Sequence, residues 1–413
     1  MRSLREYAIV TGAYWGFTVT DGALRMLVLL YLHGVGYTPI QIASMFLFYE
    51  FFGVVTNLVG GWVGARIGLT STLFAGLALQ VLAVGSMTAP EAWLSVPYVM
   101  AAQALSGVAK DLTKMSSKSY VKLVVKRGDT ETLMKWVSVL TGSKNTLKGA
   151  GFFVGAALLA TVGFRAACAG MAAALAITLI ACAISLPWGA GRAKSKPKFS
   201  AILSRDPRIN WLSGARFFLF GSRDVWFVLA LPLFLGATLG WSSYEVGAFL
   251  ALWVIGYGFV QTAAPRFTGA RGGEGRRRAP DAGQLSHWTA LLFLPLGALV
   301  AALLLDAPAG ASLIVGLALF GFLFAANSAV HSYLVVHYAD EGRVSLAVGF
   351  YYMANAAGRL LGTVLSGVVF QWFGEGKSGL VACLVTSLVL VAASRLLCTP
   401  LRRSEAAAMP SSS

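Results

Sequence analysis

Three lysines, Lys110, Lys114 and Lys118, follow the apolar run 96–105 at intervals of four residues. On a helix, this spacing places all three ammonium groups on one face, one turn apart. Like charges so close repel one another, and each costs a few kcal/mol at membrane depth unless water or an anion compensates it. The spacing therefore predicts a site for an anion.

The composition places these lysines in a membrane protein. Hydrophobic residues make up 57% of the chain and charged residues only 12%, and several apolar runs have the length of membrane-spanning helices. In a soluble chain the net charge of +16 would suggest nucleic acid. Here most basic residues flank the apolar runs, so the expected partners are the lipid bilayer and a small anionic substrate, with no nucleic acid.

The cysteines indicate neither a disulfide framework nor a metal site. Cys168, Cys182, Cys383 and Cys398 show no CxxC or Cys/His ligand spacing, so four free thiols are expected and neither metal nor cofactor is predicted. The segment Met1-Arg-Ser-Leu-Arg5 leads into the first apolar run without a small-residue cleavage site, so we expect no removed signal peptide.

The apolar pattern predicts an all-α membrane protein with twelve transmembrane helices. The predicted helices are 7–33, 39–65, 71–88, 94–118, 137–161, 165–187, 209–235, 244–265, 287–305, 309–337, 346–373 and 379–398. With a cytoplasmic N-terminus, 22 basic residues lie in inside segments and only Arg165 and Lys377 in outside ones. This bias predicts a multi-pass protein of the cell inner (plasma) membrane with both termini cytoplasmic.

Two halves repeat in the same order along the chain. The pairs are Asp21 with Asp224, Lys118-Ser-Tyr120 with His331-Ser-Tyr333, and Lys148-x-x-Gly151 with Arg359-x-x-Gly362. They predict a six-plus-six parallel repeat, with bundles at 1–188 and 209–413, the latter ending in a short cytoplasmic tail, joined by a cytoplasmic linker at 189–208.

Charged residues inside the predicted helices leave a formal excess of five positive charges, from nine basic and four acidic residues. Intramembrane charges normally pair, so the missing partner is expected to be a multiply charged anion. Arginine suits oxyanions through its fork of donors, and lysine adds an adaptable point charge. The predicted substrate-binding residues are Arg25, Lys110, Lys114, Lys144, Lys148, Arg216, Arg223, Arg359, Asn355, Tyr351 and His331. Residues predicted for coupling or charge pairing are Asp21, Glu50, Asp111 and Asp224. Asn145, Asn327 and Tyr352 are further neutral donors.

Structural roles are open for several of these residues. Lys118 lies near a predicted helix end, where its side chain can extend to the membrane interface. The sequence allows Arg25 to be neutralised by Asp21, and Arg223 by Asp224, while Lys110 and Asp111 point about 100° apart on a helix. Glu50 can titrate or pair with a cation, and His331 can be an ordinary buried polar group. Lys148 and Arg359 have no acidic neighbour at helical spacing, which favours ligand contact.

Twelve helices, a basic central loop and a parallel repeat resemble the major facilitator superfamily. The segment Gly61-Trp-Val-Gly64-Ala65-Arg66-Ile-Gly68 is similar to that superfamily's gating motif, Gly-x-x-x-Asp-Arg-x-Gly, with Ala65 at the usual Asp position. The resemblance implies the superfamily fold and a cavity lined by helices 1, 4, 7 and 10 with help from 2, 5, 8 and 11. Every intramembrane basic residue named above belongs to that set.

The run from Tyr7 to Leu30, followed by Tyr49-Glu50-Phe-Phe-Gly-Val-Val-Thr-Asn57, resembles the ArsJ-type organoarsenical efflux permeases. That resemblance implies export of 1-arseno-3-phosphoglycerate by alternating access, which confers arsenate resistance. It also implies a functional partnership with the glyceraldehyde-3-phosphate dehydrogenase that makes the compound, and we expect a monomer. The implied substrate carries several negative charges on a three-carbon frame, whereas arsenite would favour thiolates.

Two other functions fit parts of the pattern. The same cations would serve an organic phosphate/inorganic phosphate exchanger or an uptake permease. A membrane-embedded transferase is disfavoured, because the sequence has no GxSxG, HExxH, paired catalytic carboxylates or nucleotide-binding loop, and no catalytic residues are predicted. The sequence leaves open whether protons are coupled to transport.

Overall fold

The computed structural model describes residues 4–37, 39–126, 128–192, 204–228, 230–241, 243–271, 277–340 and 343–408. Most of the linker predicted at 189–208 lies outside these residues. So do some basic residues counted toward the inside bias, namely Arg2, Arg127, Lys194, Lys196, Lys198 and Arg276.

The first part of the chain is helical throughout. Its elements are α1 (Leu4–Gly34), α2 (Pro39–Ile67), α3 (Leu69–Ser86), η1 (Glu91–Trp93), α4 (Val96–Val124) and α5 (Thr130–Ser185). Gly163 breaks α5 with a φ of 77°, a left-handed conformation that glycine adopts without a Cβ clash. This break divides α5 into two helices.

The second part adds further helices and one small hairpin. Its elements are α6 (Pro207–Phe227), α7 (Ala230–Leu233), η3 (Phe234–Thr238), α8 (Ser243–Ala263), η4 (Ala264–Arg266), α9 (Ala282–Leu291), α10 (Phe293–Leu304), α11 (Ala309–Tyr338), α12 (Val344–Trp372) and α13 (Lys377–Ala407). The strands β1 (Ala270–Arg271) and β2 (Arg277–Arg278) pair antiparallel in the loop before α9.

The described residues form twelve long helical segments when α5 is divided at Gly163 and the runs α6 to η3 and α9 to α10 are each taken as one. Eight helical segments among these residues are long and apolar enough to cross a membrane, and α1, α2 and α4 have 29 or more residues each. The chain is a multi-pass, all-α membrane protein, as predicted.

Aspartates explain why three helices begin before their apolar runs. Asp129 accepts a hydrogen bond from the Thr132 backbone N–H at 3.0 Å, and α5 starts at Thr130 instead of the predicted 137. Asp206 and Asp281 cap α6 and α9 in the same way. A capping carboxylate satisfies backbone N–H groups that the first turn leaves unpaired, so the helix extends to that aspartate.

The chain divides into two compact units. Unit 1 contains residues 1–136, 143–204 and 339–353, and unit 2 contains 137–142, 205–338 and 354–413. Two helices are therefore shared between the units: residues 137–142 of α5 belong to unit 2, and the first ten residues of α12, 344–353, belong to unit 1. The linker and bundle boundaries predicted from the sequence stay a prediction.

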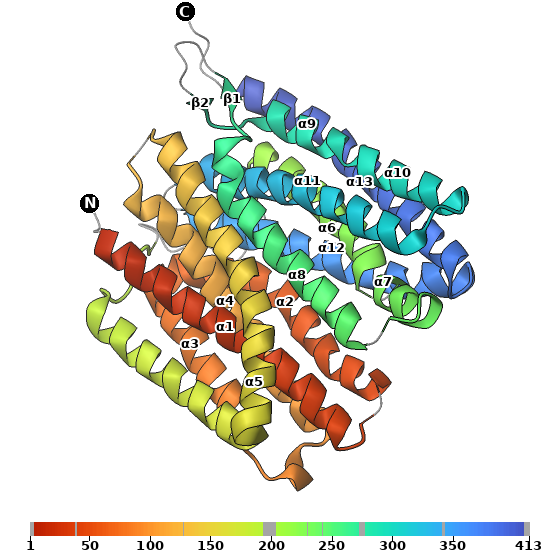
Figure 1. Cartoon of the computed structure of the whole chain (residues 1–413). Coiled ribbons are helices and arrows are strands. Elements are labelled where there is room, and N and C mark those ends of the chain that lie inside the picture. The colour runs from red at the N-terminus through yellow and green to blue at the C-terminus, as the bar shows by residue number, and fades with distance from the viewer. Residues whose placement is uncertain are drawn as a thin grey trace, which may run out of the picture. The chain divides into compact units, whose positions relative to one another are not determined.

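Each unit packs its helices around its own apolar core. In unit 1, α4 contacts α1, α2 and α3, and buried leucines such as Leu27, Leu73 and Leu77 fill the space between helices. In unit 2, α13 runs along α6, α9 and α10 (Figure 1). Trp226 and Phe320 lie in the core of this unit. The four cysteines are free and buried, as predicted.

Candidate functional site

A close crossing of α1 and α5 brings the first ion pair together. A Cβ atom at Gly22 would lie 2.6 Å from the Lys148 carbonyl oxygen, and one at Gly151 would lie 2.5 Å from that of Val19. Only glycine fits where two backbones approach so closely. The crossing places the Lys148 ammonium 3.6 Å from the Asp21 carboxylate.

The same arrangement recurs in unit 2 at the crossing of α6 and α12. A Cβ atom at Gly362 would lie 2.7 Å from the Gly221 carbonyl oxygen. Nearby, Arg359 Nε donates to Asp224 Oδ2 at 3.0 Å, and Arg223 Nε donates to Oδ1 at 2.6 Å. The Asp224 side chain is fully buried and carries two guanidinium partners.

Lys148 and Arg359 therefore have carboxylate partners that helical spacing did not reveal. Both partners come from another helix, so the search for an acid three or four residues away could not find them. The predicted pairing of Arg223 with Asp224 is present in the structure.

Tyr49 of α2 joins several charges of unit 1. Its hydroxyl donates to Asp21 Oδ1 at 2.7 Å, and its ring centroid lies 3.7 Å from Lys110 Nζ and 4.6 Å from the Arg25 guanidinium. The negative face of the ring favours such cations. Tyr49 was not among the predicted site residues, although it precedes Glu50 on the same helix.

Arg25 pairs with Glu50, not with Asp21. The two side chains approach to 3.6 Å, while the Asp21 carboxylate is occupied by Tyr49 and Lys148. The ion pair of Asp21 with Arg25 that the sequence allowed is therefore not formed among the described residues, because α2 and α5 supply nearer partners.

The three lysines of α4 lie along one face, as predicted, and each has a different environment. Asp111 lies 3.7 Å from Lys110 and accepts a hydrogen bond from Lys114. Lys118 is 2% exposed and donates to the Tyr352 hydroxyl. Extension of Lys118 to the membrane interface is therefore wrong, because a tyrosine of α12 holds the ammonium group inside unit 1.

Lys144 is the least compensated cation of this group. Its ammonium lies within electrostatic range of Lys110, Lys114, Lys118 and Lys148. Among the described residues, it forms no ion pair with a carboxylate. We call these five lysines, together with Asp21 and Asp111, the lysine cluster. Five lysines against two carboxylates leave a formal excess of three positive charges.

Tyr14 is a second tyrosine that the sequence analysis missed. Its side chain is 1% exposed, and its hydroxyl has no hydrogen-bond partner among the described residues. It lies within electrostatic range of Asp21 and Asp111. A buried hydroxyl without a partner is costly, so this one is well suited to donate to an anion bound by the lysine cluster.

The cations of the candidate site in unit 2 are arginines. Arg216 of α6 is 3% exposed, donates to Asn355 Oδ1 at 2.8 Å and to Ser328 Oγ at 2.9 Å, and stacks 3.8 Å from the Phe220 ring centroid. His331, one turn beyond Ser328, lies within electrostatic range of Arg216. The arginine cluster, defined as Arg216, Arg223, Arg359 and Asp224, has a formal excess of two positive charges.

The other predicted neutral hydrogen-bond donors differ in their surroundings, and one of them has a packing role. Tyr351 is fully buried, and its ring meets that of Tyr352 edge-on at 5.0 Å. Asn327 donates to Thr289 at 2.8 Å, which ties α11 to α9 and assigns this amide a packing role. Asn145 lies on α5 one residue beyond Lys144 and is partly exposed.

The segment that resembles the gating motif forms the last two turns of α2 and the residue Gly68, which joins α2 to α3. Gly68 adopts a φ of 103°, and a Cβ atom there would lie 2.5 Å from the Gly189 carbonyl carbon. Arg66 stacks on Trp62 at 5.0 Å from the ring centroid, and Ala65 is buried. With alanine at position 65, this motif has no carboxylate for Arg66, so an aromatic ring takes the cation.

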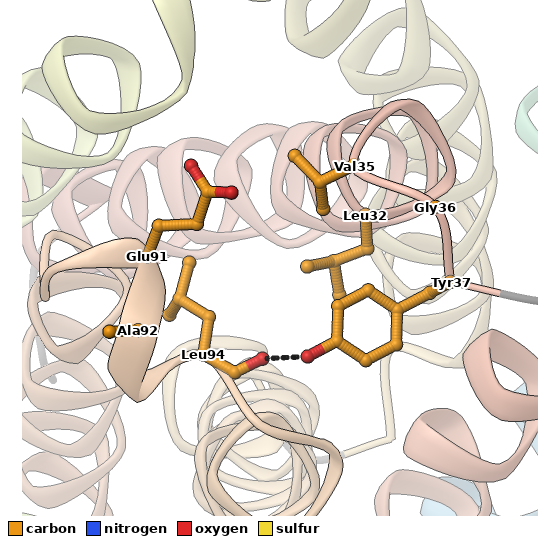
Figure 2. Close-up of a pocket in the computed structure, with 7 residues that line it drawn as sticks. All are labelled: Leu32, Val35, Gly36, Tyr37, Glu91, Ala92 and Leu94. Atoms are coloured by element: carbon orange, nitrogen blue, oxygen red, sulfur yellow. Dashed lines mark hydrogen bonds between the residues drawn. The ribbon is translucent and has the colours of Figure 1, made fainter.

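A cavity of about 600 Å³ lies at the opposite end of unit 1, where α1 ends and α4 begins. Figure 2 shows its lining, in which the Tyr37 hydroxyl donates to the Leu94 carbonyl oxygen at 2.9 Å. Of the seven residues drawn there, Glu91 alone is charged. A carboxylate repels anions, so the lysine and arginine clusters are the better candidate site.

Solved structures with a similar fold are membrane transporters. The human organic anion transporter MFSD10 (TETRAN) is 16% identical, with a TM-score of 0.72 over 95% of this chain and 99% of its own. A bacterial homologue of the iron transporter ferroportin, in an outward-facing state, is 16% identical, with a TM-score of 0.74 over 97% and 100% of the two chains. The proton:xylose symporter XylE is 14% identical, with a TM-score of 0.66 over 94% and 93%.

No protein-family model and no curated protein sequence matches this chain. The structural similarity extends over nearly the full length of both partners in each comparison, at identities that identify the fold alone. The chain has the major facilitator superfamily fold. The solved structures named here are transporters.

Proposed function

We propose that this protein is a secondary transporter that moves a small, multiply charged organic anion across the membrane. The observation that carries the proposal is Lys144 of α5, a cation within electrostatic range of four other lysines that forms no ion pair with a carboxylate among the described residues. Such a concentration of like charge is unfavourable in a membrane unless an anion or water compensates it. A transported anion supplies that compensation.

Each unit offers one anchor for the anion. The lysine cluster belongs to unit 1 and the arginine cluster to unit 2, with formal excesses of three and two positive charges. On this proposal, each cluster binds an anionic group at some stage of alternating access, so a substrate with one anionic group is a poor one.

For the substrate we propose 1-arseno-3-phosphoglycerate, on the strength of the resemblance to ArsJ-type permeases. Its phosphate and arsenate ester suit ammonium and guanidinium donors. The four cysteines are buried on the later part of α5 and on α13, outside both clusters, which argues against thiol-seeking arsenite as cargo. The proposal includes an inner-membrane location, cytoplasmic termini, a monomer, and supply of the substrate by a glyceraldehyde-3-phosphate dehydrogenase.

A resistance assay tests this substrate. Cells that express the protein together with the dehydrogenase are expected to gain resistance to arsenate and none to arsenite. A matched strain with Lys144→Gln controls for effects of membrane-protein expression. Arsenite resistance, or full arsenate resistance with the variant, would overturn the assignment.

A vesicle experiment distinguishes export from the alternative function, which is exchange or uptake of an organic phosphate. Proteoliposomes loaded with labelled 3-phosphoglycerate are diluted into buffer with or without inorganic phosphate. Efflux that needs no external phosphate supports export, whereas efflux that requires it supports an exchanger. Absence of flux above protein-free liposomes in both buffers would contradict transport of this anion class.

A further inference from the structure

The first turns of α12 pack tightly against α2 within unit 1. A Cβ atom at Gly61 would lie 2.6 Å from the Ser345 carbonyl oxygen, and one at Gly349 would lie 2.6 Å from that of Asn57. The Ser345 hydroxyl donates to the Gly61 carbonyl oxygen at 3.0 Å. We call residues 343–353 the α12 entry segment.

Lysines of α4 hold the same segment from another side. Lys122 donates to the Ala339 carbonyl oxygen, just before the segment begins. At its far end, the Tyr352 hydroxyl accepts from Lys118, and the Tyr352 ring centroid lies 4.5 Å from Lys114 Nζ and 4.8 Å from Lys118 Nζ. Two members of the lysine cluster therefore hold the α12 entry segment in place.

A bound anion and Tyr352 need the same two ammonium groups. The phenol oxygen is a neutral acceptor and the ring is a weak cation partner, whereas a phosphate or carboxylate brings an opposite charge to each ammonium group, a Coulombic attraction that the phenol lacks. An anion that reaches Lys114 and Lys118 therefore replaces Tyr352. The α12 entry segment then loses these contacts with α4, while its glycine crossing with α2 and the Ser345 hydrogen bond to Gly61 remain.

We infer that Tyr352 is a positioning residue that competes with the transported anion for Lys114 and Lys118, so that anion binding loosens the α12 entry segment from α2. This inference rests on the proposed function, because it requires the anion to bind the lysine cluster. On this inference, α12 is the helix that responds to anion binding. The helix continues from unit 1 into unit 2 without interruption.

If Tyr352 competes with the anion, the Tyr352→Phe variant should bind the anion more tightly and transport it more slowly. Phenylalanine keeps the ring but removes the acceptor for Lys118, so 3-phosphoglycerate is expected to bind about fivefold more tightly. Transport is expected to slow at the same time, because binding no longer releases a contact. A residue with a purely structural role would weaken both properties when substituted.

Loosening of the α12 entry segment from α2 is measured with a cysteine introduced where the two helices cross. Ser345→Cys is nearly isosteric, its site is 4% exposed, and the four native cysteines are buried, so background labelling is low. Maleimide labelling of the introduced thiol is followed in the purified protein with and without 3-phosphoglycerate, and binding is measured on the same sample by calorimetry. Gly349→Ala combined with Ser345→Cys is the positive control, since the added Cβ atom forces the crossing apart without ligand.

3-Phosphoglycerate is expected to accelerate labelling about fivefold in the Ser345→Cys protein and hardly at all when Tyr352→Phe is added. Binding without any change in labelling would overturn the role of Tyr352 and leave the proposed function intact. Weaker binding by Tyr352→Phe would likewise overturn the competition. If the protein does not bind 3-phosphoglycerate or glycerol 3-phosphate, the proposed function fails, and this inference fails with it.

Discussion

The Lys148 ammonium lies 3.6 Å from the Asp21 carboxylate, at a glycine crossing of α1 and α5. Arg359 and Asp224 meet at 3.0 Å at the corresponding crossing of α6 and α12. The two halves of the chain therefore share a structural feature as well as a sequence pattern. In each half, glycines allow two helices to pack closely, and an ion pair between a basic residue and an aspartate forms beside the crossing. Each unit holds its own anchor in place before any substrate arrives.

Lys144→Gln is expected to weaken binding of 3-phosphoglycerate by about tenfold or more, since hydrogen bonds to charged groups contribute about 1.5–3 kcal/mol. Expression and thermal stability are expected to stay normal, because removing one of five crowded cations relieves repulsion. Lys135→Gln, at an exposed position on the same helix, is the matched control and should bind normally. Equal affinity in the two variants would exclude Lys144 from the site.

Asp224→Asn is expected to destabilise the protein more than Asp21→Asn. The first change leaves two arginines, Arg223 and Arg359, without their carboxylate, and removing one partner of a buried pair costs about 3–5 kcal/mol. Asp21 serves one lysine, and Tyr49 remains beside it. Thermal denaturation in detergent provides the comparison, and Asp224→Asn/Arg359→Gln should recover part of the loss. Equal stability of the two single variants would contradict this ranking.

Gly22→Ala is expected to lower stability, because its Cβ atom would lie 2.6 Å from the Lys148 carbonyl oxygen. Backbone cannot give way as a side chain does, so α1 and α5 must separate. Gly16→Ala on the same helix meets nothing within 4 Å and is expected to gain up to about 1 kcal/mol from helix propensity. Melting temperatures of the pair measure the effect; a harmless Gly22→Ala would show that the crossing is looser than described.

Asp206→Ala is expected to cost about 1 kcal/mol through loss of the α6 cap. Burial alone would raise the pKa of Asp206, but hydrogen bonds from the Arg208 side chain and backbone outweigh it, and the pKa is lowered. The stabilisation is therefore present above the unfolded pKa of about 3.9 and is lost as pH falls through the folded pKa. Melting temperatures of wild type and variant should converge in acid; a difference that stays constant well below the unfolded pKa would refute this account.

The sequence predicted the fold well, because apolar runs of membrane length are strong signals. The twelve long helical segments of the described residues lie close to the predicted ranges. The largest errors are at both kinds of helix boundary: α5 begins at 130 instead of 137 and α9 at 282 instead of 287, while α4 ends at 124 instead of 118 and α13 at 407 instead of 398. Apolar periodicity begins with the first hydrophobic residue, whereas a helix begins at its cap. Asp129 and Asp281 therefore extend α5 and α9 beyond the predicted limits.

The site was harder to predict, because partners from different helices leave no mark on local spacing. Charge balance identified the cations, and the order of the repeat aligned Asp21 with Asp224. Neither revealed that Tyr49 joins Asp21 to Lys110, or that Tyr352 holds Lys118 inside the protein. Tyrosine side chains are neutral at pH 7, so a count of basic and acidic residues does not identify them as site residues.

Equilibrium binding of three matched acids tests the central claim most directly. Calorimetry on the purified protein compares 3-phosphoglycerate, which has a phosphate and a carboxylate, with glycerol 3-phosphate and lactate, which have one anionic group each. We predict the tightest binding for 3-phosphoglycerate, weaker binding for glycerol 3-phosphate and the weakest for lactate, with the first reduced by Lys144→Gln. Lactate binding as tight as that of 3-phosphoglycerate, or 3-phosphoglycerate binding that is unchanged in Lys144→Gln, would contradict a site built for a multiply charged anion.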